Sequence, residues 1–132
     1  MVERKLLLAP QTLAPLQVVF TEWVSCKGAA QLDFLVKSTD ADDPTSVDIE
    51  LTKDFITPVG PTAVEGVKCF SSGVVSGLEA NGGVLYLVCP DQTAFPGTTC
   101  LTAMAARLKI VGNAVGDLNG VQIESFGHFP WR

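Results

Sequence analysis

The chain has 132 residues, a length that fits one domain with a core of ordinary size. Apolar residues make up 47% and charged residues only 17%, a composition that excludes a disordered chain. The net charge of −5 removes the general attraction to phosphates, and no apolar run reaches the roughly 18 residues of a membrane span. We therefore expect neither a nucleic-acid partner nor a membrane partner.

Residues 1–16 begin with charged residues followed by Leu6, Leu7 and Leu8, an order that resembles the start of a signal peptide. Pro10 and Gln11 interrupt the apolar stretch, and no small-residue cleavage site follows. We expect instead an N-terminal arm over residues 1–16 that packs on the domain or on a neighbour. Residues 17–132 are then expected to form the folded domain.

Alternation of apolar and polar residues with a period of two predicts strands in the first half of the chain. Residues 18–26, 31–37 and 47–52 show it, and the turn-rich residues 38–46 favour a hairpin between the last two segments. The large apolar side chains of residues 18–26 fall on both faces, and Trp23 is expected in the core. The side chains expected on the buried faces of the hairpin are Leu32, Phe34, Val36, Val47, Ile49 and Leu51.

The middle of the chain has weaker patterns. Residues 56–63 contain prolines and a glycine, so any strand there lies at an edge. Short strands are expected at 64–70 and 73–78. Residues 84–89 are apolar on both faces, which is typical of a central strand.

Residues 100–111 favour a helix by composition, but they alternate between two faces and are therefore predicted to form a strand. This strand and residues 121–126 are expected to form a terminal hairpin across the turn residues 112–120. Seven or eight short antiparallel strands separated by turns predict an all-β, single-domain β-sandwich or jelly roll, because each sheet must bury its apolar face against another sheet.

The four cysteines, Cys26, Cys69, Cys89 and Cys100, have spacings that match no zinc site, and His128 is the only histidine. We expect four reduced thiols that pack as small apolar side chains, with one disulfide as the alternative.

Asp40, Asp42 and Asp43 form an acidic cluster in a turn, where carboxylates can bind calcium. Pro44 breaks the pattern of a calcium loop, so these aspartates are expected to lie in a solvated turn and to cap their own backbone, with calcium binding as the alternative. We predict no metal and no cofactor.

No catalytic residue is predicted, because His128 has no serine or cysteine nucleophile motif beside it. The low charged fraction suggests instead that part of the surface is covered, since interface centres are depleted of charged residues. Apolar residues near both ends of the chain are the candidates for contacts with a neighbour. These candidates are Leu6, Leu7, Leu8, Phe129 and Trp131.

Residues 23–25, 32–51 and 106–130, about half of the chain, resemble small jelly-roll structural proteins of tailed-phage virions. The resemblance implies a non-enzymatic capsid decoration or cement protein, made in the host cytoplasm and located on the capsid surface. Its implied partners are further copies of itself, with a trimer foremost, and the major capsid protein. The pattern is also similar to the galactose-binding-like sandwiches of carbohydrate-binding modules. A glycan-binding module and a phage tail or receptor-binding component therefore stay open as alternatives.

Overall fold

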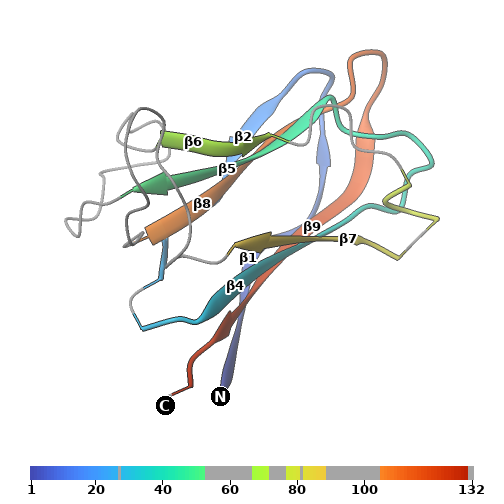
Figure 1. The fold of residues 1–132 in the computed structure, drawn as a ribbon. Coiled ribbons are helices and arrows are strands. Elements are labelled where there is room, and N and C mark those ends of the chain that lie inside the picture. Colours follow the sequence, from blue (N-terminus) through green and yellow to red (C-terminus); the bar gives the residue numbers. More distant parts are fainter. Residues whose placement is uncertain (27, 53–66, 72–76, 81, 89–104, 131–132) are drawn as a thin grey trace.

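The computed structural model consists of two layers of strands, and no helix occurs in the part of the chain that it describes (Figure 1). The described residues are 1–26, 28–52, 67–71, 77–80, 82–88 and 105–130. Within them, no helix long and apolar enough to cross a membrane is found. The strands are β1 (Val2–Leu13), β2 (Val18–Phe20), β3 (Val24–Ser25), β4 (Gln31–Lys37), β5 (Ser46–Thr52), β6 (Val67–Ser71), β7 (Val84–Val88), β8 (Ala105–Val111) and β9 (Leu118–His128).

Nested antiparallel pairs define the topology. β1 pairs with β9, β2 and β3 pair with β8, β4 pairs with β7, and β5 pairs with β6. The chain therefore resembles one long hairpin that has been rolled up, which brings β9 beside β4 and β8 beside β5. Sheet A has the order β1-β9-β4-β7, and sheet B has the order β2-β8-β5-β6 with β3 also on β8. This is a jelly roll, and the predicted all-β sandwich is confirmed.

The core lies between the two sheets and comes from the predicted faces. The apolar side chains of β4, β5 and β8 alternate as expected. Leu32, Phe34, Val36, Val47, Ile49, Leu51, Ala106, Leu108 and Ile110 are all at most 1% exposed. The choice of a strand over a helix is confirmed for residues 105–111, where this alternation decides against helical composition.

Both predicted hairpins are wrong. β4 belongs to sheet A and β5 to sheet B, so the residues between them connect the two layers. β8 and β9 are separated in the same way. The apolar faces of each predicted pair meet across the core of the sandwich, where burial alone produces the alternation that a paired hairpin would also show.

Two further predictions are corrected by the sheet order. β7 was expected as a central strand, but it is the edge strand of sheet A, with Leu85 54% exposed. Residues 18–26 form two strands rather than one. Three residues between Phe20 and Val24 oppose only two residues of β8, so a bulge interrupts the ladder there. The prediction for residues 56–63 falls outside the described residues, as does most of the predicted strand 73–78, of which the described Gly77 and Leu78 lie in no strand.

The segment expected as an N-terminal arm is placed differently. Residues Val2–Leu13 form β1, which pairs with β9 from Val2 opposite His128 to Leu13 opposite Leu118. Leu13 is fully buried in the core. The apolar run of residues 6–9 is therefore part of a strand of sheet A.

Candidate assembly surface on sheet A

The outer edge of β1 is an open edge of sheet A. β1 ends the strand order of sheet A, and residues 1–6 are all exposed. The main chains of Met1 and Phe129 exchange two hydrogen bonds, of 2.9 and 2.8 Å. Because hydrogen-bonded and non-hydrogen-bonded pairs alternate in an antiparallel ladder, the backbone groups of Glu3 and Lys5 point toward β9. Those of Val2, Arg4 and Leu6 therefore point outward.

The register also assigns the side chains of this edge to the two faces of sheet A. Val2, Arg4 and Leu6 lie opposite His128, Phe126 and Glu124, so these side chains share the outer face of the sheet. Val2 and Leu6 are each 53% exposed. Glu3 and Lys5 lie opposite Gly127 and Ser125 and project to the inner side. The edge thus combines open backbone groups with exposed apolar side chains.

A charged network lies beside this edge. The Nε atom of Arg4 donates a 2.6 Å hydrogen bond to Oε2 of Glu124, and Nζ of Lys37 lies 4.0 Å from Oε1. Gln122 donates a 2.8 Å hydrogen bond to the same Oε1 atom. Glu124 is only 2% exposed although it belongs to the outer face. The hydrogen bond from Arg4 lowers the pKa of Glu124 and outweighs burial, which acts in the opposite direction.

A second polar group lies nearer the chain ends. Nε2 of His128 is 2.8 Å from Oδ2 of Asp33, and Gln31 donates a 2.9 Å hydrogen bond to Oδ1. Asp33 is nearly buried, so these contacts satisfy a carboxylate that has little access to water. The hydroxyl-bearing side chain of Ser125 projects to the inner side of the sheet, because it lies between outward-facing positions of β9. The Ser125 hydroxyl therefore does not lie beside the His128–Asp33 pair.

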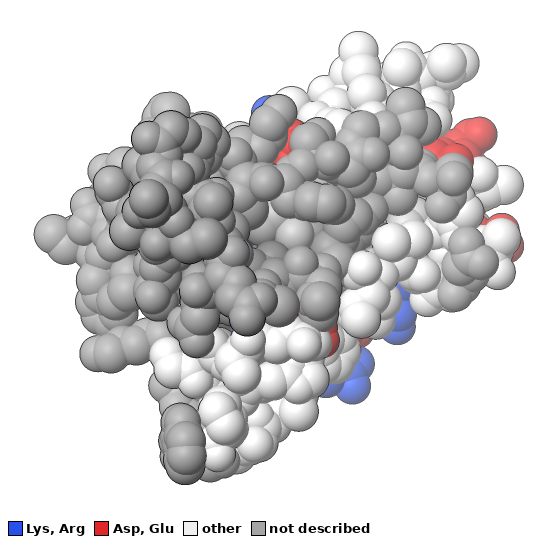
Figure 2. Space-filling view, viewed as in Figure 1, with Lys and Arg blue, Asp and Glu red and all other residues white. Residues whose placement is uncertain are grey.

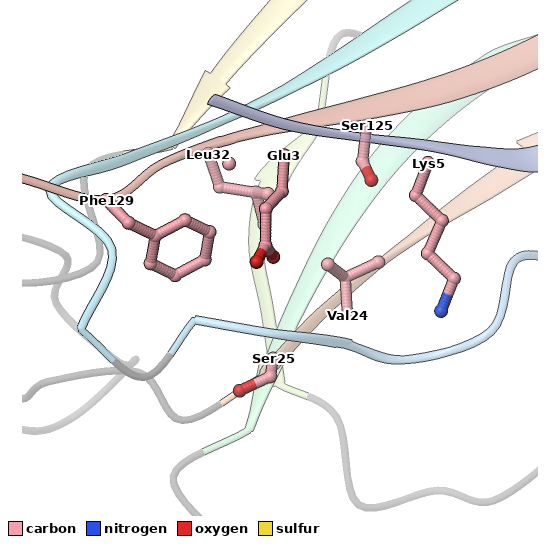
Figure 3. Close-up of a pocket in the computed structure, with 8 residues that line it drawn as sticks. Glu3, Lys5, Val24, Ser25, Leu32, Ser125 and Phe129 are labelled. Carbon is pink, nitrogen blue, oxygen red and sulfur yellow. The ribbon is translucent and has the colours of Figure 1, made fainter. Parts of the chain in front are cut away.

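A hollow of about 170 Å³ lies on the inner side of β1, and both residues of β3 contribute to its lining. Figure 3 shows the Glu3 carboxylate pointing into the hollow between the Phe129 ring and Val24. Lys5, Ser25 and Ser125 complete its polar lining. The hollow is shallow and its lining carries both charges, so it offers no set of groups that converge on one ligand.

On sheet B, an arginine side chain stacks on two aromatic rings, a contact that the sequence did not indicate. Cζ of Arg107 lies 4.3 Å from the ring centroid of Phe20 and 4.5 Å from that of Trp23. Arg107 belongs to the outer face of β8, so the expectation that Trp23 lies in the core is wrong. The bulge between β2 and β3 changes the face on which Trp23 projects. A strand pattern read without its bulge could not show this stacking.

The structure places the predicted contact residues in different environments. Leu6 is exposed, whereas Leu7 and Leu8 are partly buried and pack against the chain's own core. Phe129 is only 5% exposed, because its ring packs over Gly127. Trp131 lies outside the described residues. Leu6 is thus the candidate with an open apolar surface, and Val2 joins it on the same face.

The acidic turn and the described cysteine have structural contacts. Oδ2 of Asp40 accepts a 2.6 Å hydrogen bond from the backbone of Asn119, and Oδ1 of Asp43 accepts one of 3.1 Å from Gly77. These carboxylates cap backbone groups far along the chain rather than their own turn. The described residues contain no group of three or more potential metal ligands. Cys26 is buried. The predicted reduced state of the other three thiols concerns side chains outside the described set.

Charged side chains are sparse on the visible surface. Figure 2 shows that uncharged residues cover most of the described surface on this face, with charged side chains alone or in small groups. This agrees with the 17% of charged residues in the chain.

No protein-family model and no curated protein matches the chain. It has a distant structural resemblance to a chain in the structure of infectious bursal disease virus Gt strain. The identity is 9% over 99% of this chain and 33% of that chain, with a TM-score of 0.43. The VP2 subviral particle of infectious bursal disease virus gives 10% identity over 98% and 32% of the two chains, with a TM-score of 0.45. The chain thus spans about a third of the length of these virus chains.

A third solved structure is a family 11 carbohydrate-binding module from Clostridium thermocellum in complex with a mixed-linked tetrasaccharide. It shares 11% identity over 97% of this chain and 80% of that chain, with a TM-score of 0.38. All three TM-scores are below 0.5, so these likenesses concern general architecture and carry no information on ligands or partners.

Proposed function

We propose that the protein is a non-enzymatic structural component of a virion, a capsid decoration or cement protein that binds copies of itself and the major capsid protein. The open outer edge of β1 carries this proposal. It presents unpaired backbone groups next to Val2 and Leu6, each 53% exposed. Proteins that act alone usually protect such an edge, because an open edge invites pairing with another chain.

The polar groups on sheet A support a structural role over a catalytic one. Arg4, Lys37 and Gln122 all contact the carboxylate of Glu124, and His128 and Gln31 contact that of Asp33. These contacts use each carboxylate as an acceptor within the sheet. A hydrolytic site would need a nucleophile within hydrogen-bond reach of its base.

The glycan-binding alternative needs an open aromatic platform. Among the aromatic side chains that the structure describes, Phe34 and Phe129 are buried, and Phe20 and Trp23 stack on Arg107. Phe126 lies beneath the guanidinium of Arg4, 5.8 Å from its Cζ atom. These contacts favour assembly over sugar stacking.

Quantitative mass spectrometry of purified particles from the source that encodes this chain tests the proposal. We expect the protein in a fixed ratio to the major capsid protein, retained through a density gradient. Particles made without it are expected to lose integrity at a lower temperature than complete particles. Absence from washed particles would overturn the proposal, and specific binding of the pure protein to a glycan array would favour the carbohydrate-binding alternative.

A further inference from the structure

We infer that the β1 edge binds the β1 edge of a second copy of this chain, in an antiparallel ladder whose two-fold axis passes through Arg4. The inference rests on the self-association included in the proposed function and adds its partner strand and register. Two copies of sheet A then join into one continuous sheet. A contact of this kind is isologous and closes at two copies, whereas a ring of three needs two different surfaces on each copy.

The regular part of β1 provides the backbone for this contact. The ladder with β9 runs without a register shift from Val2 to Leu6, and the shifts begin between Leu6 and Leu8. Bulges bend a strand and end regular pairing. The outward-facing backbone groups of Val2, Arg4 and Leu6 therefore form a flat edge about five residues long, which suits one short added strand.

When Arg4 lies on the two-fold axis, the side chains of this segment in one copy complement those of the same segment in the other copy. Val2 then lies opposite Leu6 of the second copy, so two exposed apolar side chains cover each other on the outer face. Glu3 lies opposite Lys5 of the second copy on the inner face, which pairs opposite charges. Each of these contacts occurs twice because of the two-fold symmetry.

Arg4 would meet its own copy at the axis, where two like charges oppose each other. Each guanidinium is held by Glu124 of its own chain, with 2.6 Å between Nε and Oε2. Glu124 thus compensates the charge of Arg4 within each protomer before the two edges meet. The like-charge cost at the axis is correspondingly smaller.

The neighbouring registers are less favourable. The nearest registers that use the same outward backbone groups differ from this one by a shift of two residues between the two β1 strands. One such shift places Glu3 opposite Glu3, and the other places Lys5 opposite Lys5. Like charges directly opposite each other are destabilising in a ladder. The sequence Val-Glu-Arg-Lys-Leu therefore selects the register centred on Arg4.

Analytical ultracentrifugation of full-length protein tests the pairing by charge exchange. Wild-type protein is expected to form dimers, and Glu3→Lys and Lys5→Glu each place two like-charge pairs in the ladder. Each single variant should raise the dimer dissociation constant by about tenfold or more. A mixture of the two variants restores both opposite-charge pairs and should form a heterodimer. Thermal melts followed by circular dichroism check that each variant is folded, since Lys5 also contacts Glu22 at 3.1 Å.

A cysteine pair reports the register directly. Glu3 and Lys5 of two copies form a non-hydrogen-bonded pair, with Cα atoms about 4.5 Å apart, within the range of a disulfide. Mixed Glu3→Cys and Lys5→Cys chains should cross-link to each other at these positions, mapped by mass spectrometry, with wild-type protein as the control. Preferential cross-linking of two Glu3→Cys chains to each other, or of two Lys5→Cys chains to each other, would overturn the register.

The existence of the β1–β1 dimer is tested separately from its register. A wild-type monomer or trimer, or a Glu3→Lys variant that dimerises as well as wild type, would overturn the pairing. Association with particles is measured separately, so a monomer in solution removes the self-association but leaves the proposed binding to the capsid standing.

Discussion

Nε of Arg107 donates a 2.7 Å hydrogen bond to Oε1 of Glu50 across the ladder between β8 and β5. The pair lies on the outer face of sheet B, yet the Arg107 side chain is only 3% exposed. The rings of Phe20 and Trp23 lie over the guanidinium and shield it from water. A shielded guanidinium depends on its ion pair, because removing one partner leaves a charge without compensation.

Glu50→Gln should therefore destabilise the fold. The amide keeps an acceptor for Arg107 but removes the negative charge, and we expect the free energy of unfolding to fall by about 1 to 3 kcal/mol. Urea denaturation followed by tryptophan fluorescence measures this change. Glu22→Gln is the matched control, because Glu22 forms an exposed ion pair with Lys5 and should change stability by less than about 0.5 kcal/mol. Equal effects of the two variants would contradict the prediction.

Glu124 should make stability depend on pH. Its pKa is lowered from the ordinary value of 4.5 by the hydrogen bond from Arg4. Its carboxylate therefore stabilises the folded state above pH 4.5, and this contribution is lost as the pH falls through the lowered pKa. Glu124→Gln should be less stable than wild type at neutral pH, and the difference should shrink on acidification. Urea titrations at several pH values check this. A stability difference between the two proteins that grows at low pH would contradict the prediction.

Gly120 is placed where a larger residue is costly. Its φ angle is +63°, and an added Cβ atom would collide with the side chain of Thr39. Gly120→Ala should lower the free energy of unfolding by about 1 to 3 kcal/mol, since both strain and contact oppose the methyl group. Gly116→Ala is the control, because nothing lies within 4 Å of its added Cβ atom. Differential scanning calorimetry should show a lower melting temperature for the first variant alone.

Leu16 has a φ angle of +58°, in the left-handed region that disfavours residues with a Cβ atom. The side chain is exposed, so its removal sacrifices little packing. Leu16→Gly should raise the free energy of unfolding by up to about 1 kcal/mol, because relief of the strain exceeds the entropy that glycine adds to the unfolded chain. Leu16→Ala keeps the strained backbone and serves as the control. A destabilised glycine variant in urea denaturation would contradict this account.

Alternation predicted the strands and their buried faces but not their partners. Leu32 and Val47 lie on the predicted inner faces, yet β4 and β5 face each other across the core instead of pairing. The pattern is the same in both arrangements, because it reports burial on one face and not the neighbouring strand. The order of the sheets depends on contacts between distant residues, which a local pattern does not contain.

The candidate surface was predicted only in part. The sequence predicts contacts of Leu6 with a neighbour, but it does not indicate that residues 2–13 form a strand of sheet A. The sequence also did not indicate that polar residues on the outer faces are buried, since alternation places Glu124 and Arg107 on solvent-exposed faces. Glu124 is contacted by Arg4 of the adjacent strand β1, and Arg107 is covered by Phe20 and Trp23. Those neighbours become known only with the sheet order.

The nested strand order has a consequence for synthesis on the ribosome. None of β1 to β5 pairs with another member of that group, because each finds its partners among β6 to β9. The first 52 residues therefore cannot close any ladder of this fold while they emerge. β9 lies between β1 and β4, so sheet A can be completed only after residues 118–128 have been translated. Until then the nascent chain exposes its apolar strand faces, and it is at this stage that a chaperone would have to protect it.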